Sequence, residues 1–329
     1  MIATSSAIPI GTVWTLRAAP VGSWTSVTWG GWPGQELFVA VSSDGHVMTS
    51  PDGVSWIPQT NPNQQWSSVS WGGDGPQSGL APTFYAVATN LAGAPAGGKM
   101  MWSPDGVNWT QQDSVDDTAN WTAVSGAGGA FVAVGNSSPS TGVVMNANLS
   151  PSGVAEWSAP DTPVNTPWTG LAGGGNVFVA VSPGGQVMTS IASAGYNWNQ
   201  ETAPSHPWQA VGWGNPDGNP LFVAIAQDGA LITSPDGQTW TQQTSVAAQP
   251  WESINWGGPQ GQPMFVAVAP TAVMTSPDGI TWTPQPLPTG STGGWSAVVA
   301  GGVVGQETLV AVSSNGQVMT SQVTSTPVP

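Results

Sequence analysis

The chain has 329 residues, of which 44 are glycine and 31 are proline, and only 6% of its residues carry a charge. So few charges exclude a helical bundle or coiled coil, whose outer face needs Glu and Lys, while 39% hydrophobic residues and 20 tryptophans argue against disorder. Two basic residues against 17 acidic ones, a formal net charge of −15, exclude nucleic acid and anionic membrane surfaces as direct partners.

The amino-terminal residues 1–11 are expected to form an arm. They lack the basic and apolar regions of a secretory signal peptide, and no apolar run in the chain is long enough to span a bilayer. The chain has no cysteine, so disulfides and thiolate metal sites are unavailable. Residues 12–18, T-V-W-T-L-R-A, have the composition of a strand and precede everything that repeats.

From Trp24 onward one phrase recurs: W-x-x-V-x-W-G-G, a variable loop, F-V-A-V, a tight turn and V-M-T-S-P-D-G-x-x-W. The mean period is about 45 residues, which is typical of propeller blades. The copies open at Trp24, Trp66, Trp121, Trp168, Trp208, Trp251 and Trp295. Further tryptophans close each repeat, and we expect a residue this large, recurring in register, to lie in the core.

Each repeat contains four strand signals, which in the first copy cover residues 24–29, 37–41, 46–50 and 55–59. Between the second and third strands, pairs such as Asp44-Gly45 predict a two-residue hairpin turn with positive φ angles. Helical periodicity is absent. The sequence therefore predicts an all-β fold, a seven-bladed β-propeller of four-stranded antiparallel blades.

The two ends of the repeat array predict how the ring closes. The seventh repeat stops after residues 318–321 and lacks its fourth strand, which the amino-terminal strand 12–18 would supply. This pairing removes an exposed sheet edge. We expect a single propeller domain over residues 12–321, between the arm 1–11 and a carboxy-terminal tail 322–329.

Four repeats carry an intact S-P-D-G-x-x-W motif, with its acid at Asp52, Asp105, Asp236 and Asp278. The motif is similar to the Asp box of the bacterial neuraminidase repeat, although it is one residue shorter between Asp and Gly. The whole phrase, from about Trp14 to Ser321, resembles the F-V-A-V/V-M-T-S-P-D-G-x-x-W arrays of phage, giant-virus and bacterial proteins. Each carboxylate is expected to accept backbone N–H groups of its own turn, a structural role. A calcium or ligand site is the alternative, but the four acids would lie far apart on the outer rim.

The composition opposes the sialidase activity that the Asp-box resemblance implies. Sialidases hold their substrate with three arginines and use a tyrosine nucleophile, whereas Arg17 is the only arginine here. His46 and His206 are the only histidines, and both are predicted to be exposed loop residues without metal-ligand partners. A glycoside hydrolase needs only a carboxylate pair, but most acids lie in turns. We therefore expect no enzyme, no cofactor and no metal; calcium is not implied.

The candidate binding residues lie in irregular loops. Loops 89–98 and 135–142, between second and third strands of adjacent repeats, should share one face with the connection 112–120. They supply Asn90, Asp113, Asp116, Asp117 and Asn136; neutral drift of loop length is the alternative. On the opposite face, Trp32 is a candidate for sugar stacking or a protein contact, and capping of its blade is the alternative.

We expect a structural or adhesion component of a viral particle, in the first place a bacteriophage, that contacts neighbouring virion proteins or a host surface glycan and further copies of itself. This expectation rests on the resemblance and on the near absence of Lys and Arg, which removes cleavage points for trypsin-like proteases. The alternatives are a secreted or cell-surface lectin-like propeller of a bacterium and, third, a glycoside hydrolase. The expected location is the virion, or else the cell exterior.

Overall fold

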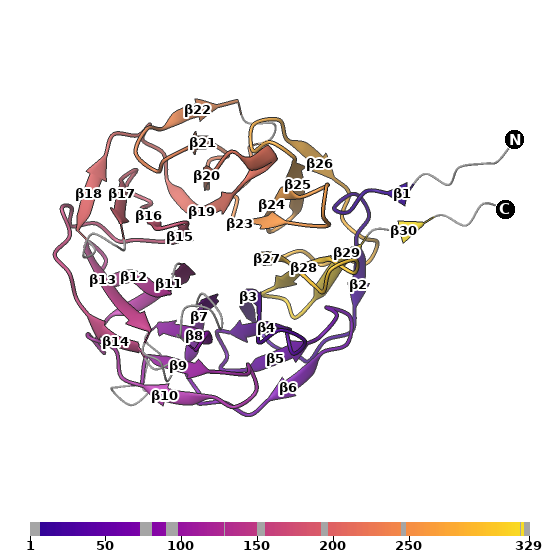
Figure 1. Cartoon of the computed structure of the whole chain (residues 1–329), viewed down its shortest axis with the longest axis horizontal. Coiled ribbons are helices and arrows are strands. Elements are labelled where there is room, and N and C mark those ends of the chain that lie inside the picture. The colour runs from indigo at the N-terminus through magenta and orange to yellow at the C-terminus, as the bar shows by residue number, and fades with distance from the viewer. Residues whose placement is uncertain are drawn as a thin grey trace, which may run out of the picture.

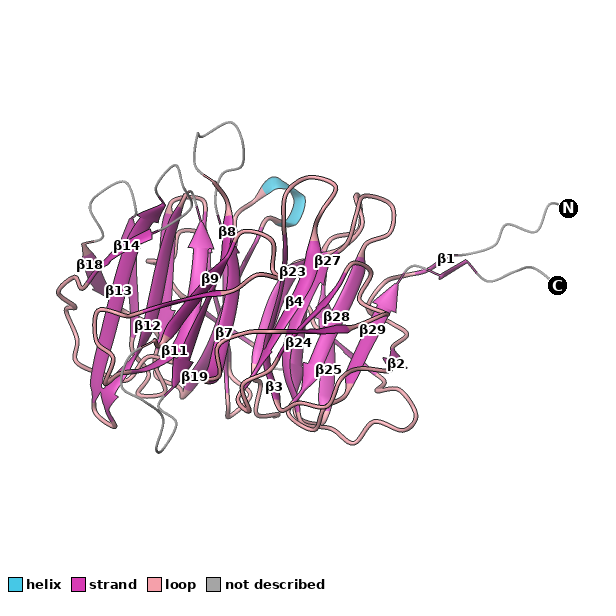
Figure 2. Ribbon diagram, turned by 90° about the horizontal axis from the view of Figure 1, so that it is seen from below, coloured by secondary structure: helices cyan, strands magenta, loops and turns pink. Residues whose placement is uncertain are grey.

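A computed structural model of the chain confirms the predicted seven-bladed β-propeller (Figure 1). It describes residues 7–72, 81–89, 98–127, 129–149, 155–191, 197–244, 248–322 and 324–325. Each blade is one antiparallel sheet whose four strands follow one another from the axis to the rim. Viewed from the side, the sheets stand next to one another, with a short 3₁₀ turn η2 (Pro216–Gly218) in one connecting loop (Figure 2).

The innermost strands all run in the same direction along the axis. They are β3 (Trp24–Gly30), β7 (Gln65–Gly72), β11 (Asn120–Ala127), β15 (Gly170–Gly174), β19 (Trp208–Gly214), β23 (Ser253–Gly257) and β27 (Trp295–Gly301). Each touches the innermost strands of both neighbouring blades, so they form a closed ring. We call the face on which they begin the front face and the face on which they end the back face.

The outer strands complete six of the sheets in sequence order, and the amino-terminal strand completes the seventh. The second strands are β4 (Leu37–Ser42), β8 (Thr83–Thr89), β12 (Ala130–Ser138), β16 (Val177–Val181), β20 (Leu221–Ala226), β24 (Met264–Ala269) and β28 (Thr308–Ser313). The third strands are β5 (Val47–Ser50), β9 (Met100–Ser103), β13 (Thr141–Leu149), β17 (Val187–Ile191), β21 (Leu231–Ser234), β25 (Ala272–Ser276) and β29 (Val318–Gln322). The rim strands are β6 (Ile57–Gln59), β10 (Thr110–Gln112), β14 (Ala155–Ser158), β18 (Trp198–Glu201), β22 (Thr241–Gln243), β26 (Thr283–Gln285) and β2 (Thr15–Arg17).

The amino-terminal strand closes the ring as predicted. Strand β2 pairs antiparallel with β29, with Leu16 opposite Met319, and so becomes the rim strand of the seventh blade. Just before β2, the Gly11 amide donates to the hydroxyl of Ser321 at 2.8 Å. Two short strands beyond this blade, β1 (Ala7–Ile8) and β30 (Thr324–Ser325), pair with each other, so the segments that enter and leave the ring lie side by side (Figure 1).

In four blades the hairpin between the second and third strands differs from the two-residue turn that the sequence predicts, whereas in the sixth blade Ala269 pairs with Ala272 around a two-residue turn. In the first blade the Ser42 amide donates to the His46 carbonyl, which leaves a three-residue loop, Ser43-Asp44-Gly45. Only Gly45 has a positive φ, +89°, and the loop ends of the fourth, fifth and seventh blades at Gly185, Gly229 and Gly316 match it. The reason is that three-residue loops combine an ordinary turn with one left-handed residue, which only glycine adopts without cost.

The predicted loop 135–142 in the third blade is also wrong. Strands β12 and β13 continue through it, with Gly135 opposite Val143 and Asn136 opposite Gly142, and a register shift before Ser138. The hairpin turns only at residues 139–140. The Ser, Asn and Gly residues that suggest a loop here are accommodated because the strand ends beyond the edge of the core.

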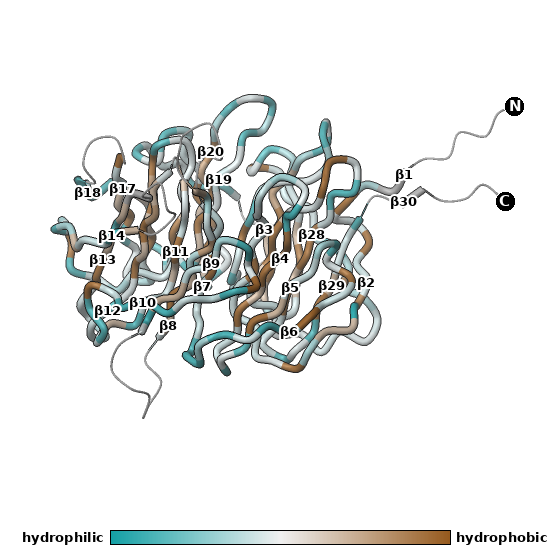
Figure 3. The backbone as a smooth tube through the Cα atoms, turned by 60° about the horizontal axis from the view of Figure 1, so that its bottom comes forward, coloured by the Kyte–Doolittle hydropathy of each residue, from teal (hydrophilic) through white to brown (hydrophobic). Residues whose placement is uncertain are grey.

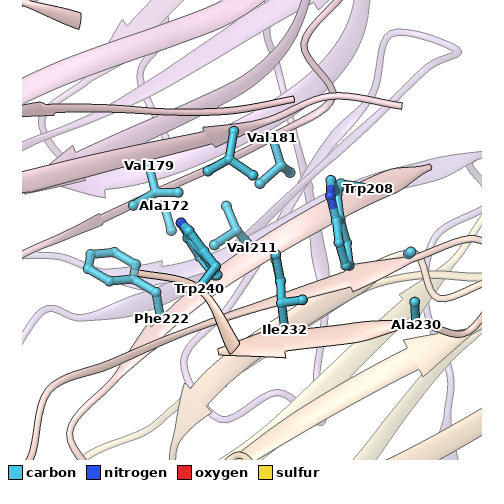
Figure 4. Packing of buried hydrophobic residues seen from close by; sticks show 12 residues of the cluster. Ala172, Val179, Val181, Trp208, Val211, Phe222, Ala230, Ile232 and Trp240 are labelled. Atoms are coloured by element: carbon cyan, nitrogen blue, oxygen red, sulfur yellow. The ribbon is translucent and has the colours of Figure 1, made fainter. Parts of the chain in front are cut away.

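The hydrophobic core consists of wedges between adjacent blades. Each of seven clusters combines side chains of two neighbouring blades; the cluster between the fourth and fifth blades contains Val179, Val181, Trp208, Phe222 and Ile232 (Figure 4). Apolar residues follow the strands, and polar residues the connections (Figure 3). The opening tryptophans are at most 1% exposed, as predicted. Of the closing tryptophans, Trp56, Trp109 and Trp157 are only half-buried.

At the back face, tryptophan side chains pack directly against glycines of the preceding blade. Trp71, near the end of β7, covers Gly30 at the end of β3, and a Cβ added to Gly30 would overlap the Trp71 indole. Trp29 covers Gly301, Trp213 covers Gly174 and Trp256 covers Gly214 in the same way. The W-G pair of the repeat is therefore one contact shared between two blades, because the glycine makes room for the next blade's indole.

Candidate functional site

A cavity of about 290 Å³ lies at the front end of the propeller axis. Its wall includes the residue that directly follows the opening tryptophan in each of the seven blades. These residues, which we call the axial ring, are Thr25, Ser67, Thr122, Thr169, Gln209, Glu252 and Ser296. In five blades this residue is the extra one of a β-bulge, as Thr25 is between Trp24 and Ser26, and it is left without a partner opposite on the second strand.

Five members of the axial ring are hydroxyls that link adjacent blades. Thr122 Oγ1 donates to the carbonyl oxygen of Trp168 in the next blade at 2.7 Å and lies 3.0 Å from that of Val134 in its own blade. The hydroxyls of Thr25, Ser67, Thr169 and Ser296 reach the carbonyl of the next opening tryptophan at 2.8, 2.6, 2.9 and 2.7 Å. A hydroxyl has one proton, so these bonds leave its oxygen as an acceptor toward the cavity.

A second layer of side chains satisfies the backbone just below the ring. The Oγ atoms of Ser26, Ser68 and Ser253 accept the amides of Val69, Val124 and Val298 at 3.2, 3.1 and 3.2 Å. An innermost strand is a sheet edge, whose N–H groups need partners. Small polar side chains at this position therefore belong to the construction of the ring.

The fifth and sixth blades depart from the hydroxyl pattern with Gln209 and Glu252. Gln209 Nε2 donates to Glu252 Oε2 at 3.1 Å, and Gln227 Nε2 donates to Gln209 Oε1 at 3.0 Å. Burial raises the pKa of the Glu252 carboxyl above its ordinary value, and the Gln209 bond opposes this only in part. The axial ring thus has one acid and one carboxamide, side by side.

Within the part of the chain that the structure describes, Glu252 has no cationic partner, because Arg17 and Lys99 both lie elsewhere. Arg17 Nε donates to Thr320 Oγ1 at 2.8 Å on the rim of the seventh blade. Lys99 is buried beside the second blade, where its Nζ donates to the Thr89 carbonyl at 3.3 Å. The cavity wall is therefore negative at one point and otherwise neutral.

Farther from the axis than Gln209, the fifth blade contains a histidine, His206, that is hydrogen-bonded to an aspartate, Asp228. His206 Nδ1 lies 2.7 Å from Asp228 Oδ2, and Gln242 Nε2 lies 3.5 Å from His206 Nε2. Burial raises the pKa of Asp228, but the bond from His206 and that from the Ala230 amide together hold it below its ordinary value. The prediction that His206 is exposed is wrong: its side chain is 30% exposed, whereas that of His46 is 59% exposed.

The three predicted loop acids gather on the front face, where two bind their own loop and Asp113 binds the backbone before β9. Asp113 Oδ1 accepts the Gly98 amide at 2.9 Å, which joins loop 112–120 to the start of β9. Asp116 Oδ1 accepts the amide and hydroxyl of Thr118, and Asp117 Oδ1 those of Ser114. Burial lowers the pKa of the Lys99 ammonium, and the charge of Asp117 offsets part of this.

Of the remaining predicted binding residues, Asn136 meets the end of the connection 112–120, and Trp32 lies on the opposite face. Asn136 lies on strand β12, where its Oδ1 is 3.4 Å from Asn120 Nδ2. Asn90 lies outside the described residues. Trp32 is half-buried on the back face, in a turn closed by a 2.8 Å bond from the Gln35 amide to its carbonyl.

The four Asp boxes share one hydrogen-bond pattern at the back rim. Asp105 Oδ1 accepts the amides of Val107 and Asn108 at 2.9 and 2.8 Å and the Ser103 hydroxyl at 2.9 Å. Asp52, Asp236 and Asp278 accept the equivalent three bonds. Burial raises the pKa of these carboxyls, but their bonds outweigh it and hold the pKa below the ordinary 3.8. A Cβ on Gly106 would meet Val39 of the preceding blade, so each turn also sits against its neighbour.

Tyr85, one of the two tyrosines, is wholly buried between the second and third blades. Its hydroxyl accepts the Ala155 amide at 2.8 Å, and burial raises its pKa to about 12. The side chain therefore packs and anchors a strand.

Glu252 and Gln209 are the residues that sequence reasoning missed. The signal was present: the position after the opening tryptophan is Ser or Thr in five repeats and Gln or Glu in two adjacent ones. The departure lies inside a regular strand pattern, where one polar residue in place of another is unremarkable. Among the described residues, no group of three or more His, Asp or Glu side chains is arranged to hold a metal ion, and no helix is long and apolar enough to cross a membrane.

Comparison with solved structures places the chain among β-propellers. It resembles YCF48 from Cyanidioschyzon merolae (16% identity, TM-score 0.66, 94% of this chain and 98% of that chain) and YCF48 bound to D1 peptide (17%, TM-score 0.67, 98% and 100%). It also resembles a streptogramin B lyase (7%, TM-score 0.72, 94% and 98%). No protein-family model and no curated protein matches the sequence, so neither the Asp-box family nor another is confirmed. At these identities the likeness shows the fold, a seven-bladed propeller.

Proposed function

We propose that the chain is a non-enzymatic binding module that engages its partner on the front face, around the propeller axis. The observation that carries this proposal is the Gln209–Glu252 pair in the axial ring. Five blades use this position to hold the ring together, whereas two adjacent blades place longer polar side chains there, beside a cavity. A propeller of this fold has been solved with a bound peptide, which supports a peptide or protein as one kind of partner.

The setting that we propose is adhesion or structural contact in a viral particle. Its grounds are the resemblance of the repeat phrase to phage and giant-virus arrays and the presence of only two basic residues. In that setting the partner is a neighbouring virion protein or a host surface glycan. A lectin-like propeller on a bacterial surface would use the same face, so the front-face proposal is independent of the setting.

The test is a binding survey of the purified protein against a glycan array, a peptide array and intact bacterial cells, with and without calcium. Saturable binding that weakens in a Gln209→Thr/Glu252→Ser variant would support a front-face site. That variant restores the hydroxyls of the other blades and should keep the fold. Binding that this variant retains and Trp32→Ala abolishes would place the site on the back face, and absence of saturable binding in every arm would contradict the proposal.

A further inference from the structure

We infer that the axial cavity accepts a primary ammonium group, with Glu252 as its counter-charge. The inference deepens the proposed function, on which it rests, by assigning a chemical class to the part of the partner that enters the axis. The ammonium would come from a lysine side chain of a protein partner or from a small amine such as an amino sugar.

The wall of the cavity supplies acceptors. The hydroxyl protons of Thr25, Ser67, Thr122, Thr169 and Ser296 are held by backbone carbonyls, with a second carbonyl 3.0 to 3.4 Å from each hydroxyl. Their oxygens can only accept from a guest at the axis. An ammonium has three N–H donors and no acceptor, so it is complementary to such a ring.

Glu252 adds the charge that selects a cation. It receives one hydrogen bond from a neutral amide, on Oε2, and the two cationic side chains of the protein are engaged elsewhere. A carboxylate that is partly buried without a counter-ion is unfavourable, which its raised pKa reflects. A cation entering the cavity would relieve that cost.

The geometry favours an ammonium over other cations. Side-on pairing with a guanidinium needs both carboxylate oxygens, and Gln209 already uses part of the accepting capacity of Oε2. Calcium takes six to eight oxygens, usually with several carboxylates, whereas this wall offers a single acid. The cavity, at about 290 Å³, lies just below the usual range of roughly 300–1,000 Å³ for ligand pockets, so it suits a side chain or small amine.

Ligand-observed NMR and calorimetry with the full chain would test this. The probes are Nα-acetyl-lysine methylamide and glucosamine, with the Nε-acetylated lysine derivative, an arginine derivative and calcium chloride as comparisons. We expect saturable binding of one or both amines, at least tenfold weaker binding of the neutral derivative, and at least tenfold weaker amine binding by Glu252→Gln. Glu307→Gln, which removes an acid on the back face, should bind as the unaltered protein does.

The outcomes separate this inference from the proposed function. Amine binding that Glu252→Gln retains, or equal binding of the neutral derivative, would overturn the inference, as would binding of neither amine. Preference for calcium or for the arginine derivative would overturn it too. If the surveyed partner binds the front face and Glu252→Gln leaves that binding intact, the proposed function stands and the ammonium inference fails. Glu252→Ser provides a second variant with a side chain that the ring already accommodates.

Discussion

The two ends of the innermost strands hold the seven blades together by different means. At the back face, an indole of one blade fills the space over a glycine of the preceding blade, as Trp71 does over Gly30. At the front face, a hydroxyl of one blade donates to a carbonyl of the next, as Thr122 does to Trp168. Shape joins the back end at the four indole–glycine contacts, whereas at the other three interfaces a side chain accepts a backbone amide of the next blade, as Ser70 Oγ does from Gly126. The front end is joined by hydrogen bonds alone.

This difference explains where the molecule has room for a partner. Where a large side chain packs against a glycine, the contact leaves no free space, and few other residue pairs fit there. A joint made by single hydroxyls leaves the axis open, so a blade can exchange its hydroxyl for a longer side chain without disturbing the strand. Gln209 and Glu252 are two such exchanges, and they occur at the front end.

The largest effect is expected from filling a back-face glycine. Gly30→Ala would place a methyl group where the Trp71 indole lies, and overpacking of this kind costs about 3 kcal/mol of unfolding free energy. Urea denaturation would measure the loss. The matched control is Gly212→Ala on β19, where the nearest atom to the added Cβ is Ile254 Cγ2 at 3.2 Å. Equal losses at the two sites would show that the back-face joint is not made by shape, and Trp71→Ala should rescue Gly30→Ala in part.

A smaller loss is expected at the back rim. Asp105→Ala removes an acceptor that two amides, a hydroxyl and the Asn108 side chain share, and the loss should be about 1–2 kcal/mol because the turn is partly exposed. The lowered pKa sets the pH dependence: the contribution of Asp105 is present above the ordinary pKa of 3.8 and is lost as the pH falls through its folded pKa. Chemical denaturation would measure the difference in unfolding free energy between the unaltered protein and Asp105→Ala at pH 7 and at pH 3. We expect this difference to be smaller at pH 3, and an equal difference at both pH values would argue against this role of the carboxylate.

At the front face, loss of one hydroxyl should lower the unfolding free energy by less than Gly30→Ala or Asp105→Ala does. Thr122→Val keeps the volume of the side chain and removes its bonds to Trp168 and Val134, for which we expect about 1 kcal/mol. Thr122→Ser retains the hydroxyl and should stay near the unaltered protein. The midpoints of urea unfolding would compare the two; if they are equal, the hydroxyl does not join the blades.

The smallest change, with the opposite sign, is expected for Glu252→Gln. The pKa of Glu252 is raised, so the stability that its protonated form contributes is present below the ordinary pKa of 4.5 and lost as the pH rises through the folded pKa. The Gln variant, which resembles the protonated form, should unfold at a slightly higher temperature than the unaltered protein at pH 7 and together with it near pH 3.5. Lower stability of the variant at pH 7 would contradict the unpaired charge.

The repeat phrase was sufficient to predict the blades, because each strand has a β-branched or aromatic run between turn residues, and Trp14 with residues 12–18 indicated the closing strand. The sequence did not predict the length of the hairpins, since Asp-Gly suits both two-residue and three-residue loops. In the first blade's loop, Ser43-Asp44-Gly45, only Gly45 takes the left-handed conformation. It also did not predict the axial site. A polar residue inside a regular strand is ordinary by itself, and only the closed ring shows that Gln209 and Glu252 meet.

The closing strand has a consequence for how the chain folds during synthesis. Six blades are formed by consecutive residues, so each can assemble soon after its last strand leaves the ribosome. Strand β2 is made early, yet its partner β29 follows about 300 residues later, as the bond between Gly11 and Ser321 illustrates. Contacts so distant in sequence carry a large loop-closure entropy and form slowly. We therefore expect closure of the seventh blade to be the last step of folding. Until then the Trp14 side chain lacks its complete pocket, because β29 supplies part of it.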